Sequence, residues 1–172
     1  HAAAIVKYAA RSEMYVTSVY DVPNRFAKVN LSNLTFTSVG LGTNDYLTDD
    51  MACRYMDDTG SICYVGTDEG ALNPMGYKID TRTMATSTFS TGGASTYGMF
   101  IKDNDLYALG INDTLVRYKN FDTSAPEIFS TPGITPNEML YSTDGKMFLT
   151  DWSDSSRLVE FNLKKVLAEE KE

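Results

Sequence analysis

Histidine is almost absent from this sequence, since the 172 residues contain a single one, His1. A histidine general base, a Ser-His-Asp arrangement and a histidine-ligated metal are therefore disfavoured. The 23 aspartates and glutamates leave carboxylate chemistry open, but their spacing singles out no acid–base pair. We predict no catalytic residues and lean against an enzyme.

Long apolar runs and basic clusters are also missing. No apolar stretch approaches the roughly 20 residues needed to span a bilayer, and the longest Lys/Arg run is Lys164–Lys165. The formal net charge is −8, whereas nucleic acid and anionic membranes bind clustered basic faces. A hydrophobic content of 42% is ordinary for a globular protein. The sequence thus predicts a folded acidic domain without a membrane span or a nucleic-acid partner.

Cysteine occurs only twice, as Cys53 and Cys63 on either side of the segment RYMDDTGSI. If Asp57–Gly60 forms a turn, antiparallel pairing places the two cysteines nearly opposite each other, at a separation that allows a disulfide. The alternative is a pair of buried free thiols that pack as small apolar side chains. Two cysteines without a second pair do not form a tetrahedral zinc site.

Four segments of the sequence share one pattern of an aromatic residue, a polar turn, an apolar residue and a second aromatic residue. They are KYAARSEMYVTS, RYMDDTGSICYVGT, MFIKDNDLYALG and LYSTDGKMFLTD, with the aromatic pairs Tyr8/Tyr15, Tyr55/Tyr64, Phe100/Tyr107 and Tyr141/Phe148. Each is followed by an alternating strand: RFAKVNL, MGYKIDT, TLVRYKN and RLVEFNL. In these strands an apolar pair lies on one face and a charged residue on the other, as period two requires.

The anchors Tyr15, Tyr64, Tyr107 and Phe148 follow one another at 49, 43 and 41 residues. Units of about 40–45 residues that form four-stranded antiparallel meanders are typical of β-propeller blades. We therefore predict an all-β chain, a single propeller of four blade-like repeats at about 4–43, 44–94, 95–135 and 136–172. A sandwich or a barrel is the alternative, but neither requires the same anchor pattern to restart after each fourth strand.

Ring closure has three solutions: a small four-bladed ring, half of a larger ring completed by a second chain, or a fragment of a longer polypeptide. Of these we favour a half or a fragment of a seven- or eight-bladed ring. The C-terminal KKVLAEEKE is compatible with either the missing outer strand or a terminal helix.

Two segments, YVTSVYDVPNRFAKVNLSNLTFTSVG and STDGKMFLTDWSDSSRLVEFNL, resemble the YVTN-type blade repeat of surface-layer and periplasmic propellers. Only the first copy carries YVT and only the fourth carries Asp-Gly. The resemblance implies a seven-bladed, often extracytoplasmic fold used for binding, and it identifies no catalytic residues in this sequence. Streptogramin-lyase-like propellers depend on histidine, which makes this sequence a poor match to them.

In a propeller, the loops between second and third strands lie on the same face as the loops between blades. We expect six residues on this loop face: Tyr20, Arg25, Asp68, Glu69, Asn73 and Trp152. Aromatic residues among polar groups suit recognition of a protein or a glycan. For Trp152 the alternative is packing against the next blade.

Acidic turns leave calcium possible as a cofactor, because carboxylate and amide oxygens are its ligands. Asp103-Asn104-Asp105 could supply some of them, although no segment has the twelve-residue calcium-loop spacing. The alternative is that Asp and Asn simply form hairpin turns there. No other cofactor is predicted.

Three functions follow as hypotheses. The first is a non-catalytic binding module, extracellular, on the cell surface or periplasmic. The second is a structural part of a larger propeller, whose exposed blade edges pair with another chain. The third is a lactonase-like or lyase-like enzyme that uses carboxylates and a divalent metal.

Overall fold

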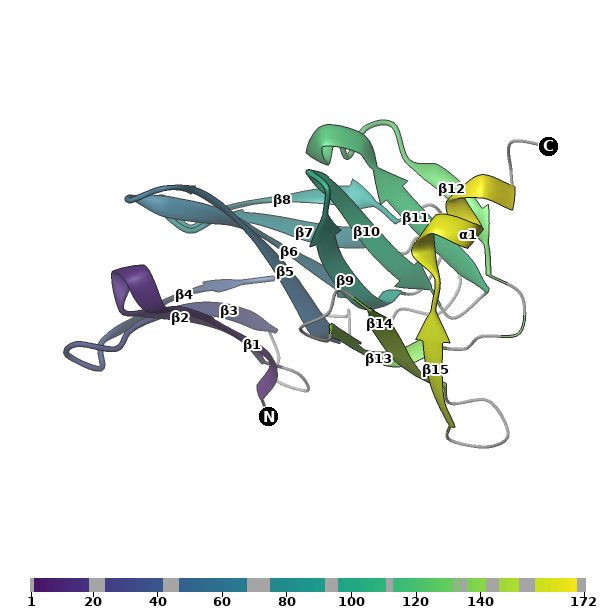
Figure 1. Ribbon diagram of the computed structural model, residues 1–172. Helices are drawn as coiled ribbons and strands as arrows, with labels where there is room; N and C mark the ends of the chain where they lie inside the picture. Colours follow the sequence, from purple (N-terminus) through teal and green to yellow (C-terminus); the bar gives the residue numbers. More distant parts are fainter. Residues whose placement is uncertain are drawn as a thin grey trace.

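The chain forms four antiparallel sheets arranged side by side as blades (Figure 1). This computed structural model describes residues 2–18, 24–41, 47–67, 75–91, 96–110, 113–131, 133, 136–141, 146–151 and 157–169. Three sheets have four strands, and each is a meander in which consecutive strands pair. The all-β propeller fold predicted from the repeats is therefore confirmed.

The four sheets are named blades 1 to 4 in chain order. Blade 1 comprises β1 (Ala2–Tyr8), β2 (Glu13–Ser18), β3 (Arg25–Asn30) and β4 (Phe36–Gly40), with a 3-10 turn, η1 (Ala9–Arg11). Blade 2 comprises β5 (Leu47–Asp57), β6 (Gly60–Thr67), β7 (Met75–Asp80) and β8 (Ala85–Ser90). Blade 3 comprises β9 (Thr96–Lys102), β10 (Asp105–Gly110), β11 (Thr114–Tyr118) and β12 (Glu127–Ser130), with η2 (Lys119–Phe121). Blade 4 comprises β13 (Pro136–Tyr141), β14 (Met147–Asp151) and β15 (Arg157–Phe161), followed by helix α1 (Leu163–Glu169).

Three apolar cores hold the blades together, one between each pair of neighbours. Alternating side chains of the second strand contribute to the cores on both faces of a blade. In blade 2, Tyr64 packs toward blade 3, while Val65 packs toward blade 1. Because successive side chains of a strand point to opposite faces, every inner blade is apolar on both. This explains why the repeats lack separate cores of their own, as in other stacked-repeat proteins.

Blade 4 differs from the prediction of four equal four-stranded repeats. Among the described residues it has three strands, and the segment after β15 continues as helix α1. Leu163, Val166 and Leu167 of this segment pack into the core between blades 3 and 4. Lys, Leu, Ala and Glu are strong helix formers, and the apolar residues at i, i+3 and i+4 give the helix one face to bury. Of the two alternatives for the C-terminal segment, the structure therefore shows the helix.

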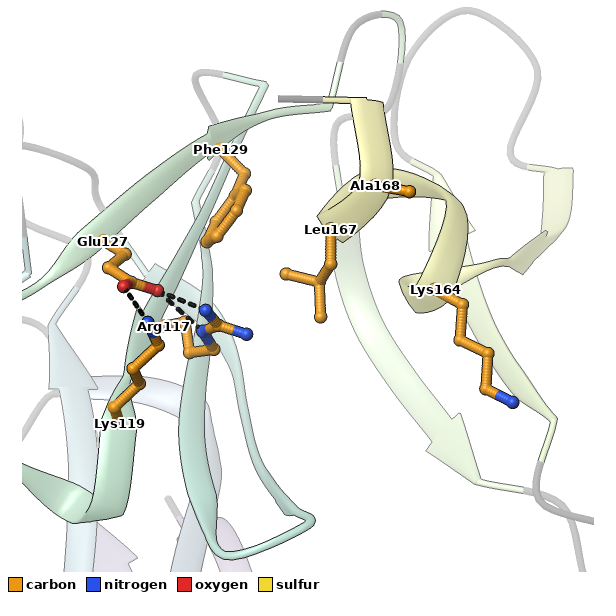
Figure 2. Close-up of a pocket in the computed structure, with 7 residues that line it drawn as sticks. All are labelled: Arg117, Lys119, Glu127, Phe129, Lys164, Leu167 and Ala168. Carbon is orange, nitrogen blue, oxygen red and sulfur yellow. Dashed lines mark hydrogen bonds and ion pairs between the residues drawn. The ribbon is translucent and has the colours of Figure 1, made fainter. Parts of the chain in front are cut away.

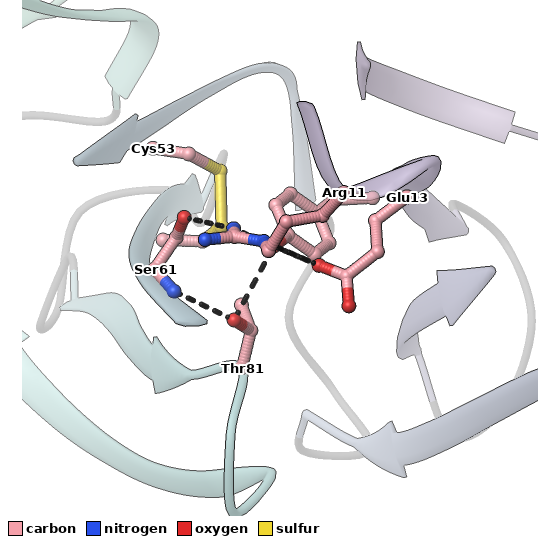
Figure 3. Close-up of a disulfide and its surroundings, with 7 residues drawn as sticks. Arg11, Glu13, Cys53, Ser61 and Thr81 are labelled. Carbon is pink, nitrogen blue, oxygen red and sulfur yellow. Dashed lines mark hydrogen bonds and ion pairs between the residues drawn. A yellow bond between two sulfur atoms is a disulfide. The ribbon is translucent and has the colours of Figure 1, made fainter. Parts of the chain in front are cut away.

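A buried arginine adds a polar connection between blades 1 and 2 (Figure 3). The guanidinium of Arg11 donates to the Asp57 carbonyl, the Tyr15 hydroxyl and Ser61 Oγ, each at 2.7 Å, and to Glu13 Oε2 at 3.0 Å. Only 9% of the Arg11 side chain is exposed. Two of its four partners come from its own blade and two from blade 2, so one side chain bonds both sheets.

Candidate binding surfaces

The loop face is built at one edge of the blades, where second strands end and third strands begin. Ser18, Arg25 and Gly40 lie opposite one another in adjacent strands at this edge of blade 1. Arg25 is exposed, and its backbone N–H donates to Ser18 Oγ at 3.0 Å. The structure therefore places Arg25 at the predicted face. The other five predicted residues, Tyr20, Asp68, Glu69, Asn73 and Trp152, lie outside the described residues.

An arginine occupies the same position in blade 4, at the start of β15. Arg157 Nε donates to Asp151 Oδ2 at 2.9 Å, and its Nη2 donates to the Gly133 carbonyl at 3.2 Å. The Asp151 side chain is fully buried, whereas 57% of the Arg157 side chain is exposed. Since a buried carboxylate needs a partner to remain charged, this pair orders the base of the loop edge. Sequence reasoning missed both residues, although they precede and follow the predicted loop that contains Trp152.

A cavity of about 670 Å³ lies between α1 and the outer strands of blade 3 (Figure 2). It is lined by Arg117, Lys119, Glu127, Phe129, Lys164, Leu167 and Ala168. Arg117 and Lys119 both bind the Glu127 carboxylate, with 2.8 Å from Arg117 Nε to Glu127 Oε2. The cavity thus combines an apolar wall from Phe129 and Leu167 with an ion-paired polar wall.

The electrostatics of this polar wall favour a charged Glu127. Hydrogen bonds from Lys119 and then from Arg117 hold the pKa of Glu127 below its ordinary value, outweighing the opposing effect of partial burial. One carboxylate shared by two cations leaves this wall positive in an otherwise acidic chain. The register that pairs Arg117 with Glu127 across β11 and β12 creates the wall, and α1 closes the cavity from the other side. The sequence carried no signal for a contact between these segments.

Cys53 and Cys63 form a disulfide between β5 and β6. The two residues are direct partners in the register of these strands, with Cα atoms 4.0 Å apart. Cys63 is fully buried in the core between blades 1 and 2, close to the Arg11 contacts (Figure 3). The bridge therefore joins the first two strands of blade 2, β5 and β6, on the side where blade 1 packs.

Reduction of this disulfide should lower the free energy of unfolding by about 2–3 kcal/mol, because the open chain gains loop entropy when it unfolds. Urea unfolding with and without reductant measures the loss. The matched control is the Cys53→Ala, Cys63→Ala double variant, in which reductant should have no effect because no other cysteine exists. Equal stability of the native chain with and without reductant would contradict this expectation.

The segment considered for calcium forms the tight turn between β9 and β10. Asp103 and Asn104 both have positive φ, 50° and 66°, a conformation that Asn and Asp adopt more readily than most residues. Asp105 Oδ1 accepts from the Asn120 N–H at 2.9 Å, and Asn104 Nδ2 donates to Asn120 Oδ1 at 3.1 Å. These polar groups connect the turn to η2, and calcium binding here stays a prediction.

Within the described ranges, no three His, Cys, Asp or Glu side chains come together as a possible metal site. None of the helices in those ranges has the length and apolarity required to cross a membrane.

The blades and their shared cores define a β-propeller fold, and comparison with solved structures agrees. The crystal structure of selenomethionine-substituted virginiamycin B lyase from Staphylococcus aureus superposes with a TM-score of 0.63 at 17% sequence identity. The match covers 94% of this chain and 55% of the other, so this chain spans about half the length of that protein. At this identity the likeness shows the fold alone. No protein-family model and no curated protein matches the sequence.

Proposed function

We propose that this chain is part of an extracytoplasmic β-propeller that works as a non-catalytic binding module and recognises a protein or a glycan through its loop face. The observation that carries the proposal is that the second strand pairs with the third in every blade, as β2 pairs with β3 in blade 1. The connections between these strands therefore all leave the sheets at the same edge. Loops positioned by a rigid scaffold are where proteins concentrate binding residues. The blades supply that scaffold through three continuous cores.

The composition of these loops supports recognition. Tyr20 and Trp152 are aromatic residues with few rotatable bonds, so they contribute contact area at a low entropic cost. Arg25 adds an exposed guanidinium at the edge of the same face, and its planar fork suits carboxylates and polar ligand groups. Aromatic and arginine side chains are also those that contribute most at protein interfaces.

The extracytoplasmic location is supported by the disulfide. Such bonds persist in oxidising compartments and are rare where glutathione keeps thiols reduced. A bridge that joins the paired strands β5 and β6, with Cys63 fully buried, is a structural disulfide. Secretion, cell-surface attachment or a periplasmic location would each provide the oxidising conditions.

Trp152 is the only tryptophan in the sequence and belongs to the predicted loop face, so its fluorescence serves as the probe for this proposal. We expect its fluorescence emission to change saturably in a panel of neutral, anionic and cationic oligosaccharides and extended peptides. Arg25→Ala should weaken binding of the responding ligand about tenfold, the loss of one charge-assisted hydrogen bond. Arg82→Ala is the matched control, because Arg82 lies in the turn between β7 and β8 at the opposite edge. No saturable response, or equal weakening by the two variants, would overturn the proposal.

A further inference from the structure

The cavity between α1 and blade 3 is separate from the loop face. Lys119 of its polar wall lies in η2, directly after β11. The hydrogen bond from the Asn120 N–H to Asp105 Oδ1 holds η2 beside the turn between β9 and β10. That turn lies at the edge where first strands lead into second strands, opposite to the edge where second strands lead into third strands. A molecule bound in the cavity would therefore leave the loop face open.

The size and the apolar wall of the cavity are those of a small-molecule site. Its volume of about 670 Å³ lies within the roughly 300–1,000 Å³ of such sites, which combine apolar walls with a few polar groups. Figure 2 shows Leu167 pointing from α1 toward Phe129 and Arg117. Leu167 is only half-buried and Ala168 is exposed. The helix side of the apolar wall is thus accessible to a bound molecule.

The charged residues that line the cavity are mostly basic. Among the described residues of the lining, Arg117, Lys119 and Lys164 are cations and Glu127 is the one carboxylate. Arg117 and Lys119 share that carboxylate, so it offsets one of their two charges, and Lys164 adds a further positive charge. This excess stands against a formal net charge of −8 for the whole chain.

A smaller cavity, of about 180 Å³, shares Lys164 and has the same charge pattern. Its charged lining in the described part of the chain consists of Lys102, Lys146, Lys164 and Glu160, with Lys146 and Glu160 ion-paired at 3.7 Å. The two cavities together are lined by five different cations and two carboxylates, although Asp and Glu outnumber Lys and Arg by 23 to 15 in the sequence. A concave surface with charges of one sign concentrates ligands of the opposite sign.

We propose that the cavity between α1 and blade 3 binds a small amphipathic carboxylate, a molecule with one carboxylate group on an apolar body. Arg117 and Lys119 already hold the carboxylate of Glu127, so this wall suits that chemical group, and the excess positive charge favours a second one. Phe129 and Leu167 would contact the apolar body. The proposal is independent of what the loop face binds.

Isothermal titration calorimetry with octanoate tests the proposal. We expect saturable binding of octanoate. Octanamide, which has the same length without the charge, should bind about tenfold more weakly because it loses a charge-assisted hydrogen bond. Octylamine, a cation, should bind more weakly still. Acetate has the carboxylate without the apolar body and should show no measurable binding at the concentrations that saturate with octanoate.

Two lysine variants place the binding in the cavity. Lys119→Gln and Lys164→Gln should each weaken octanoate binding about tenfold, and because both residues are exposed the variants should keep the fold. Lys165→Gln is the matched control, an exposed neighbour on the same helix that does not line the cavity, and it should bind octanoate normally. Arg25→Ala should also bind it normally, which separates this site from the loop face.

Two results with the native chain would overturn the proposal: no saturable binding of octanoate, or equal binding of octanoate and octanamide. Among the variants, octanoate binding that survives both Lys119→Gln and Lys164→Gln would overturn it. So would a loss of binding in Lys165→Gln as large as the losses in those two variants.

Discussion

Replacing Arg11 by methionine should lower the free energy of unfolding by about 3 kcal/mol or more. The guanidinium donates to four groups, and methionine fills a similar length without any donor. Glu13 would lose its ion pair while its side chain stays only 17% exposed. Removing one partner from a buried charged network typically costs about 3–5 kcal/mol, because the remaining charge is left without compensation.

The same variant should loosen blade 1 before the rest of the molecule. Blade 1 lies at one end of the arc (Figure 1), and the Arg11 contacts to Asp57 and Ser61 are part of what holds it on blade 2. Amide hydrogen exchange should therefore accelerate in β1–β4 more than in β9–β12, since local opening has its own free energy. Urea unfolding gives the total loss of stability.

Arg82→Met is the matched control for this experiment. Arg82 also pairs with Asp57 and Asp80, but 39% of its side chain is exposed, and surface ion pairs contribute at most about 1 kcal/mol. If Arg11→Met is no more destabilising than Arg82→Met, or if exchange accelerates equally in all blades, the Arg11 network does not hold blade 1.

The strand pattern could be predicted because its cause is local. Period-two alternation in RFAKVNL and its three counterparts fixed which residues share a face, and the structure buries Ile79 and Tyr118 on the expected apolar side. The pairing of Cys53 with Cys63 likewise followed from the length of one turn. Each of these features depends on residues fewer than about twelve apart, where strand geometry decides the result.

Contacts between distant segments could not be predicted in this way. Arg11 and Ser61 are 50 residues apart in the sequence, and nothing in either segment specifies the other. The cavity has the same origin, because Phe129 and Leu167 meet only after blades 3 and 4 have packed. Helix α1 was undecided from sequence since KKVLAEEKE is short, and its tertiary contacts rather than propensity stabilise it.

Truncating Tyr64 to alanine should destabilise the chain by about 3–5 kcal/mol, the range for removing a buried aromatic side chain. Tyr64 is 1% exposed, and its ring lies 6.1 Å from that of Phe89 and 5.9 Å from that of Phe121. Burial also raises the pKa of Tyr64 above its ordinary value. The cavity left by alanine would open the core between blades 2 and 3, at the centre of the arc, so the loss should spread to both blades. Urea unfolding measures it.

Two further variants separate packing from other causes. Tyr64→Phe keeps the ring and its aromatic contacts, so it should cost about 1 kcal/mol or less. Tyr55→Ala removes a tyrosine that lies in the same hairpin but is 45% exposed, and it too should cost about 1 kcal/mol or less. A loss of stability for Tyr55→Ala equal to that for Tyr64→Ala would contradict the role of the second aromatic anchor as the contact between blades. A much larger loss of stability for Tyr64→Ala than for Tyr55→Ala would show that the second aromatic residue of each repeat is the one that packs between blades. Tyr15, Tyr64 and Tyr107 each pack toward the following blade in this way.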